Sequence, residues 1–247
     1  MKKKYKALML DLDGTTIPNK SDGRPSQKVI KTIKIAREKL HVGAVTGRPY
    51  IFAKDIMQDL SLSGPSIVSG GGMIIDPSSE EILWRKPIDS ENIEKVYKLL
   101  KEVAIPFWVK TENVENEITK GTNEQFSISI RDIPEEKAYV IENKLKNIPQ
   151  ITMHKLVGWK SGTVWLQVTH IDATKQYGIF EVAKILGIRT HEIIGVGDGY
   201  NDFPLLMACG LRVAMGNAVP ELKAIADYVA PTVEDDGVAD VIEKFIL

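Results

Sequence analysis

The chain has few of the residues that build disulfides or histidine metal sites. Cys209 is the only cysteine among 247 residues, which excludes an intrachain disulfide and suits a reducing cytoplasm. Its neighbours are mostly apolar, so the thiol is expected to pack rather than to react. The four histidines stand far apart, without the spacing of metal ligands: His41, His154, His170 and His191. No histidine metal centre is therefore expected.

Long apolar runs and an excess charge of either sign are also missing. No apolar stretch approaches the roughly 20 residues that cross a bilayer. The stretch behind the basic start Met1–Lys4 is interrupted by Asp11 and Asp13, too early for a secretory core. The formal net charge is −1, which offers no footprint for nucleic acid or an anionic membrane. We therefore expect a cytoplasmic protein without either partner; its oligomeric state stays open.

Strands alternate with helices at both ends of the chain. The first half predicts a strand at 5–11, a helix at 26–39 capped by Ser26, a strand at 42–45 and a helix to about residue 60. The last quarter predicts a helix at 173–186 ending at Gly187, then strands at 192–196, 211–215 and 228–230 with helices between and after them. This α/β order favours a parallel sheet covered by helices on both faces.

The middle of the chain follows a different pattern. Between residues 84 and 168 the expected strands pair without intervening helices, as in 125–131, where Phe126, Ile128 and Ile130 alternate inward. Two amphipathic helices, around residues 93–103 and 138–145, accompany them. We predict a smaller α+β domain at 84–168, inserted into a core made of 1–83 and 169–247.

The first strand ends in two carboxylates, at Asp11 and Asp13. Successive strand residues face opposite sides, so both carboxylates are expected to point the same way while Leu12 turns into the core. Two like charges so close require a divalent cation or a shared proton. Such a pair can provide a nucleophile and a proton-exchanging group. The alternative is a surface turn, for which Asp-Gly is common.

Other strand ends also carry polar groups, and ligands of parallel sheets bind at these ends. Thr46-Gly47-Arg48 follows the second strand, where a hydroxyl, an amide and a glycine suit an anionic oxygen; a plain strand-to-helix turn is an equal alternative. Arg48 either reaches the substrate or lies exposed at a helix start. The strand at 192–196 leads into Gly197–Asp202, with two more carboxylates and the Asn201 amide.

Lys175 stands near the start of a predicted helix, where its charge opposes the helix dipole. A negative charge close to Lys175 would explain this unfavourable position. The alternative is an ordinary surface lysine, which is the more common case. Together, a nucleophile, an acid–base group, a hydroxyl, a lysine and an acidic loop provide what phosphoryl transfer needs.

These segments, in this order, resemble the four motifs of the haloacid dehalogenase superfamily. They are Asp11-Leu12-Asp13-Gly14-Thr15, Thr46-Gly47-Arg48, Lys175 and Gly197–Asp202. The insertion between the second and third resembles the α/β cap of the Cof-type branch, as do Val213–Ala218 and Glu234–Ala239. The resemblance implies a Rossmann-like core and Mg²⁺-dependent hydrolysis of a phosphoester through an aspartyl-phosphate.

The resemblance also implies a role for each motif residue. Asp11 would be the nucleophile, and Asp13 would protonate the leaving oxygen and then activate water. Thr46, with Gly47 and Arg48 beside it, and Lys175 would bind the phosphoryl group or substrate. Asp198 would hold Mg²⁺ together with Asp11 and the backbone carbonyl of Asp13. Asp202 would be a direct or indirect ligand, and Asn201 would orient phosphate or a metal-bound water.

Two positions depart from the family pattern. Ser69–Gly72 stands where relatives often carry Asn-Gly-Ala, which puts any contact of that asparagine amide in doubt here. Gln176 follows Lys175 where relatives often have glycine. Neither change removes a charge from the predicted centre.

Three functions fit this reading. The first is a phosphatase acting on a small phosphorylated metabolite such as a sugar phosphate or phosphoglycolate. The second is a phosphomutase acting on a sugar phosphate, and the third is a non-catalytic regulator that binds a phosphorylated ligand. Clustered carboxylates without a catalytic use only destabilise a fold, which argues against the third.

The inserted segment offers two further candidates for substrate contact. Four tryptophans lie in this segment or at its border: Trp84, Trp108, Trp159 and Trp165. Most are expected to pack in the core or on a sheet face, and the alternative is that one of them lines a substrate pocket. Residues 155–162 predict a hairpin loop that either overhangs the site and selects the leaving group or merely connects two strands.

Overall fold

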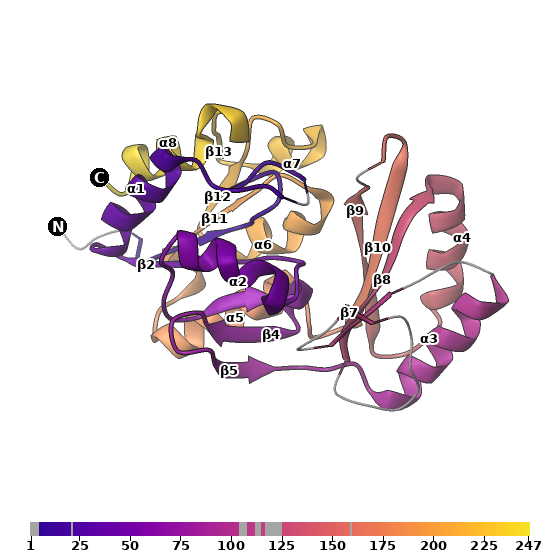
Figure 1. Cartoon of the computed structure of the whole chain (residues 1–247). Coiled ribbons are helices and arrows are strands. Elements are labelled where there is room, and N and C mark those ends of the chain that lie inside the picture. The colour runs from indigo at the N-terminus through magenta and orange to yellow at the C-terminus, as the bar shows by residue number, and fades with distance from the viewer. Residues whose placement is uncertain (1–4, 21, 104–107, 112–114, 117–124, 159) are drawn as a thin grey trace.

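A computed structural model of the chain describes residues 5–20, 22–103, 108–111, 115–116, 125–158 and 160–247 (Figure 1). At its centre five parallel strands pair in the order β13-β12-β11-β1-β2. These strands are β1 (Ala7–Leu10), β2 (His41–Ala44), β11 (Ile193–Gly197), β12 (Leu211–Ala214) and β13 (Tyr228–Val229). Because β1 lies between β11 and β2 and pairs in parallel with both, three strand ends meet at one edge.

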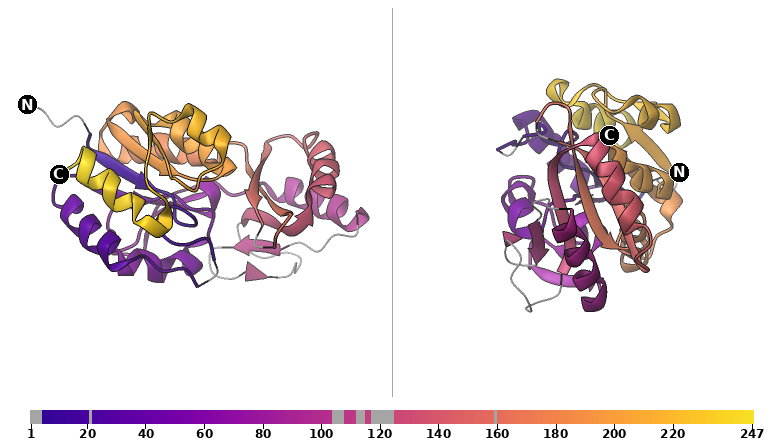
Figure 2. Two further views of the ribbon diagram at one scale, coloured as in Figure 1. Left: turned by 90° about the horizontal axis from the view of Figure 1, so that it is seen from above. Right: turned by 90° about the vertical axis from the view of Figure 1, so that its right-hand side faces the viewer.

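Helices cover this sheet on both faces, as predicted (Figure 2). On one side α1 packs with α8, and on the other α5 packs with α6. The core helices are α1 (Gln27–Arg37), α2 (Tyr50–Asp59), α5 (Lys175–Leu186), α6 (Phe203–Ala208), α7 (Pro220–Ile225) and α8 (Gly237–Phe245).

The caps of two core helices follow from the sequence. The Ser26 hydroxyl accepts a hydrogen bond from the Val29 amide at 3.1 Å, which caps α1 as predicted. Helix α5 ends at Gly187, whose φ of 64° is the left-handed conformation that glycine adopts easily. The predicted helix at 173–186 therefore begins two residues later than expected, because Thr174 is its N-cap.

A small antiparallel sheet next to the core was not predicted as such. It consists of β3 (Ser66–Val68), β4 (Met73–Asp76) and β5 (Glu81–Arg85). The chain reverses between β3 and β4 through the 3₁₀ turn η1 (Ser69–Gly71), where Gly70 and Gly71 have φ values of 73° and 115°. Side-chain periodicity alone does not reveal such a turn, which depends on glycine conformation.

The middle of the chain forms a separate antiparallel sheet in the order β7-β6-β8-β10-β9. Helices α3 and α4 cover the face of this sheet that points away from the core (Figure 1). The elements are α3 (Ser90–Glu102), β6 (Trp108–Thr111), β7 (Glu115–Asn116), β8 (Gln125–Pro134), α4 (Glu135–Leu145), β9 (Ile151–Val157) and β10 (Thr163–His170). Hereafter this unit is called the cap.

The buried apolar residues form two clusters, one in the core and one in the cap. Leu83 and Trp84 of β5 pack against the core cluster, whereas Ile88 belongs to the cap cluster. Phe126, Ile128 and Ile130 are buried, as predicted for the inward face of their strand. The fold class is confirmed; the boundaries at residues 84 and 168 stay a prediction.

The polar face of the cap sheet lies across from the carboxyl ends of the core strands (Figure 1). Within the described residues, no helix combines the length and apolarity needed to cross a bilayer.

Candidate active site

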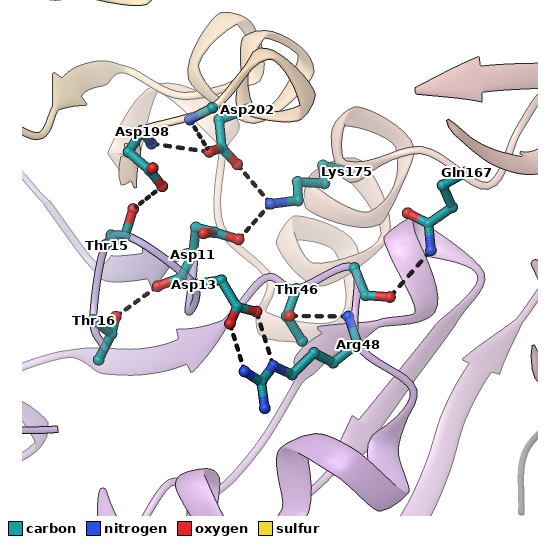
Figure 3. A network of polar contacts seen from close by, with 12 residues as sticks. Asp11, Asp13, Thr15, Thr16, Thr46, Arg48, Gln167, Lys175, Asp198 and Asp202 are labelled. Atoms are coloured by element: carbon teal, nitrogen blue, oxygen red, sulfur yellow. Dashed lines mark hydrogen bonds and ion pairs between the residues drawn. The ribbon is translucent and has the colours of Figure 1, made fainter. Parts of the chain in front are cut away.

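The carboxyl ends of β1 and β11 bring three aspartates into one cluster. Asp11 follows β1, and its amide donates to the Val196 carbonyl of β11 at 3.0 Å. Asp198 follows β11, and Asp202 ends the 3₁₀ turn η3 (Tyr200–Asp202). One carboxylate oxygen from each of the three lies within 4.8 Å of the others. The structure thus brings together residues from the two ends of the chain, as the motifs predicted (Figure 3).

Lys175, the first residue of α5, bridges two of these aspartates. Its ammonium donates to Asp11 Oδ1 at 2.6 Å and to Asp202 Oδ1 at 2.5 Å. All three side chains are buried, with exposures of 3% for Lys175, 6% for Asp11 and 1% for Asp202. Although burial opposes the charge, the two carboxylates raise the pKa of Lys175 well above its usual value. The lysine is therefore a fixed cation, and the surface alternative does not hold.

Glycine at two positions lets backbone segments approach this cluster. Gly14 has φ 82°, and a Cβ atom there would lie 2.2 Å from Asp198 Oδ2. Gly71, with φ 115°, lies against the backbone of Thr174, where a Cβ would come within 2.3 Å. The glycine turn between β3 and β4 therefore supports the start of α5, and with it Lys175.

Hydrogen bonds orient the two acids of the acidic loop. Thr15 Oγ1 donates to Asp198 Oδ1 at 2.9 Å. Asp202 Oδ2 accepts from the backbone amides of Asp198 and Gly199, both at 2.9 Å. Asp202 thus closes its own loop and also binds Lys175. Its position supports an indirect role in metal binding at least as well as a direct one.

The electrostatics of the cluster suit a divalent cation. Burial, and then the charge of Asp202, raise the pKa of Asp11 well above the usual value, despite Lys175. Burial and Asp202 likewise raise the pKa of Asp198 to about 7. The three aspartates outnumber the one lysine, and carboxylate oxygens are the donors that Mg²⁺ prefers. The donor set therefore fits the magnesium ion that the family resemblance implies.

Asp13 points away from this cluster and binds Arg48. The Arg48 guanidinium donates from Nε to Asp13 Oδ2 at 2.8 Å and from a terminal nitrogen to Oδ1 at 2.5 Å (Figure 3). The Arg48 side chain is 15% exposed, so it is not the solvated surface residue of the alternative interpretation. This bidentate pair was not predicted, because the sequence gives no distance between two loops 35 residues apart.

Thr46, Gly47 and Asn201 also lie at this edge. Thr46 is buried; its amide donates to the Ile67 carbonyl at 2.9 Å, and its hydroxyl accepts from the Arg48 amide at 3.0 Å. Gly47 and Asn201 line the cavity described next.

A cavity of about 400 Å³ separates the core strand ends from the cap sheet. Its core wall includes Asp11, Asp13, Asn19, Gly47, Arg48, Pro49, Phe52, Asp198, Gly199 and Asn201. Its cap wall includes Ser129, Arg131, Leu156, Trp165, Leu166 and Gln167. Apart from Trp165, and Leu156 within the predicted hairpin at 155–162, these cap residues were not among the predicted site residues. For Ser129 and Arg131 a signal was present, because they alternate along the chain with the predicted inward residues Ile128 and Ile130.

One cap side chain is hydrogen-bonded directly to the core. Gln167 Nε2 donates to the carbonyl of Gly47 at 3.1 Å, and the side chain also lies close to Gly70 (Figure 3). His154 of β9 is half-buried, and its inaccessible Nε2 atom has no hydrogen-bond partner among the described atoms. Burial, and then the charge of Lys175, lower the pKa of His154 to about 4, so this imidazole is neutral.

The cap candidates from the sequence have different positions. Trp84 packs on the core, Trp165 lines the cavity, and Trp159 lies outside the described residues. Trp108 is in β6. The hairpin between β9 and β10 begins near the acidic loop, since Lys155 Nζ lies 5.5 Å from the ring centre of Tyr200. That the hairpin tip selects the leaving group stays a prediction.

Comparison with known proteins identifies the family. The sequence matches the family described as haloacid dehalogenase-like hydrolase over residues 8–146 and 111–242. The chain belongs to this family. The prediction of a hydrolase of the haloacid dehalogenase superfamily is thereby confirmed.

Curated relatives match along nearly the whole chain. A Bacillus subtilis protein named 5-amino-6-(5-phospho-D-ribitylamino)uracil phosphatase is 28% identical over 249 residues, covering 98% of this chain and 96% of the relative. A Methanopyrus kandleri protein named phosphoglycolate phosphatase is 28% identical over 241 residues, covering 97% and 96%. The names of these two relatives refer to different substrates.

Solved structures share the fold. A haloacid dehalogenase-like hydrolase from B. subtilis superposes with a TM-score of 0.85 at 22% identity, covering 98% of this chain and all of that one. A protein described as a subclass IIB sugar phosphatase gives a TM-score of 0.82 at 24% identity, covering 97% and 98%. Both cover core and cap together.

Proposed function

We propose that this chain is a Mg²⁺-dependent phosphatase that hydrolyses a small phosphorylated metabolite through an aspartyl-phosphate on Asp11. The observation that carries the proposal is the buried Lys175 held between Asp11 and Asp202, with Asp11 and Asp198 in the wall of the cavity. The names of the curated relatives, which are phosphatases, also support it. The lone cysteine suits a reducing compartment, and we propose the cytoplasm as the location.

In the first step a carboxylate oxygen of Asp11 attacks phosphorus, and the bond from phosphorus to the leaving oxygen breaks. Lys175 holds the other oxygen and fixes the direction of the nucleophile. Lys175 and the Thr46 hydroxyl, with Gly47 and Arg48 on the same wall, bind oxygens of the transferring group, and their fixed positions require no reorganisation. Asn201 orients the phosphate from the acidic loop.

Asp11, Asp198 and the Asp13 carbonyl would hold Mg²⁺, with Asp202 beside them. When bound, the ion offsets the negative charge that the carboxylates and the phosphate bring together. Without such a cation, an anionic phosphate entering beside three aspartates and one lysine would meet net repulsion.

Asp13 donates a proton to the leaving oxygen and afterwards takes one from the water that attacks the phosphoenzyme. Arg48 occupies both carboxylate oxygens of Asp13 in the structure, so the exchange requires the release of at least one of these hydrogen bonds. A substrate that draws Arg48 toward its own oxygens would free Asp13. Proton exchange would then be coupled to substrate binding.

The experiment that tests the proposal measures phosphate released from p-nitrophenyl phosphate with and without Mg²⁺. Asp11→Asn should lower kcat by about 10⁴-fold or more, because the covalent step is lost. Asp22→Asn, an exposed aspartate at 82% exposure, is the matched control and should keep wild-type turnover. Circular dichroism and thermal unfolding verify that both variants fold.

Turnover by Asp11→Asn close to that of the wild type would contradict the covalent mechanism. The same assay run on sugar monophosphates separates the alternatives. Phosphate release without an isomerised product eliminates a mutase. Tight binding of phosphorylated ligands without turnover of any of them would favour the non-catalytic regulator.

A further inference from the structure

A β-bulge in the cap aims one arginine at the cavity. Strand β8 pairs with β10 through Ile133 and Val164, and the next pair is Ile130 with Leu166. Arg131 and Asp132 together therefore stand opposite a single residue, Trp165. Bulges of this kind bend a strand and redirect its side chains, and they are frequent beside active sites. Asp132 has φ 49°, a left-handed conformation that is uncommon for residues other than glycine.

The bulge fixes the orientation of the indole ring opposite it. Trp165 Nε1 donates to Asp132 Oδ1 at 2.9 Å, and Thr163 Oγ1 donates to the same oxygen at 3.3 Å. In this left-handed conformation the carboxylate of Asp132 binds the indole of Trp165, which lines the cavity.

The guanidinium of Arg131 lies on that ring, with Cζ 5.0 Å from the ring centre. Both residues line the cavity across from Asp11 and Arg48. A guanidinium that stacks on an aromatic face can also donate two parallel hydrogen bonds from its edge to a carboxylate or phosphate.

The charges on the two walls of the cavity differ. Among the described residues that line it, the cap wall contributes one cation, Arg131, and no carboxylate. The core wall contributes Asp11, Asp13 and Asp198 with Arg48. A leaving group bound next to the cap therefore meets the half-buried Arg131 cation, with the carboxylate of Asp132 close to it. The volume of about 400 Å³ lies in the range of roughly 300–1,000 Å³ that holds small-molecule ligands.

We propose that Arg131, held on Trp165 by the Asp132 bulge, is a specificity-determining residue that binds a second anionic group on the leaving group. The substrate is then a phosphorylated acid or a bisphosphate rather than a phosphorylated neutral alcohol. This inference rests on the proposed function for the phosphate end and extends it to the far end of the substrate.

The test compares kcat/KM within two substrate pairs. The first pair, 3-phosphoglycerate and glycerol 3-phosphate, differs by a carboxylate. The second pair, fructose 1,6-bisphosphate and fructose 6-phosphate, differs by a phosphate. The wild type should prefer the anion-bearing member of at least one pair by about tenfold or more, the effect of one charge-assisted contact. Which pair shows the preference distinguishes a carboxylate from a second phosphate.

Variants of the bulge locate the preference. Arg131→Met should reduce the ratio to about one, and Arg131→Lys should restore part of it because a point charge lacks the paired geometry. Trp165→Phe, which keeps a ring but loses the hydrogen bond to Asp132, should give an intermediate ratio. Lys137→Met removes an exposed cation of α4 from the cap and should leave the ratio unchanged.

A calorimetric arm keeps this test independent of turnover. The same four compounds are titrated into Asp11→Asn, with and without Arg131→Met, in the presence of Mg²⁺. If no substrate releases phosphate with the wild type, the proposed function fails, yet the affinity ratio still decides on Arg131. A ratio near one in both pairs, no binding of either anion-bearing compound, or a preference that survives Arg131→Met would overturn the proposal.

Discussion

The two walls of the cavity between core and cap are built differently. The core wall consists of strand ends, where Asp11 is bound to the buried Lys175 at 2.6 Å, and Lys175 is bound in turn to the buried Asp202 at 2.5 Å. The cap wall is one face of an antiparallel sheet; among the described residues that line it, Arg131 stacks on Trp165 and Gln167 is hydrogen-bonded to the core. The first arrangement suits a reaction that is the same for every phosphate ester. The second can change residue by residue without disturbing that reaction.

The core wall should respond most to loss of charge. In the metal-free protein the pKa of Asp198 is raised to about 7 from an unfolded value near 4. The folded protein therefore loses stability as the pH rises through this interval, by as much as a few kcal/mol. Asp198→Asn should unfold at a higher temperature than the wild type at pH 8 without metal, because a repelled charge is gone.

With Mg²⁺ bound, we expect the wild type to unfold at a higher temperature than Asp198→Asn. Saturating Mg²⁺ should stabilise the wild type by about 2–3 kcal/mol and Asp198→Asn much less. Thermal unfolding at pH 8 with EDTA or with Mg²⁺ measures both effects, with Asp22→Asn as the control. Equal stabilisation of wild type and Asp198→Asn by the metal would place the ion elsewhere.

His154 of the cap is affected by the charge of Lys175 in the core. Its pKa is lowered to about 4 from an unfolded value near 6.5, so between these pH values the unfolded chain binds more protons than the folded one. Stability should fall as the pH drops through this interval, by up to about 3 kcal/mol.

Urea unfolding at pH 7.5 and pH 4.5 measures this dependence. Because the raised pKa of Asp198 gives the opposite slope in the same interval, the readout is the change between variants. His154→Gln should gain stability at pH 4.5 relative to pH 7.5 when compared with the wild type, whereas the exposed His191→Gln should keep the wild-type difference. If His154→Gln retains the wild-type difference, the histidine is not the neutral group described above.

The smallest expected effect concerns the contact between the walls. Gln167→Ala removes the hydrogen bond to the Gly47 carbonyl, worth about 1 kcal/mol. Because Gln167 positions the cap wall, KM should rise about fivefold while kcat changes less. Steady-state kinetics, with the exposed Gln58→Ala as control, measure the two constants. A large fall in kcat with unchanged KM would assign Gln167 to the chemistry instead.

The core wall could be predicted from the sequence because its signals are local. Asp11, Thr46 and Asp198 each follow an apolar strand, and parallel strands bring their carboxyl ends to one edge. Lys175 was predicted from its place at a helix start. The pair of Asp13 with Arg48 was not, because it depends on the path of two loops.

The cap wall could be predicted only in part. Alternation identified the buried face of β8, and thereby implied that Ser129 and Arg131 lie on the other face. The bulge at Asp132 and the side on which the core lies depend on tertiary structure. The periodicity of a strand predicts neither the bulge nor the position of the core, so Arg131 and Gln167 were not among the predicted site residues.

The most direct test of the account is to trap the phosphoenzyme. The protein is mixed with substrate and Mg²⁺, quenched in acid within the first turnover and reduced with borohydride, and its peptides are weighed by mass spectrometry. The account predicts that Asp11 is converted to homoserine and that Asp13, Asp198 and Asp202 are unchanged. Phosphate release in the same mixture with Asp11 unmodified, or with the modification on another residue, would contradict it.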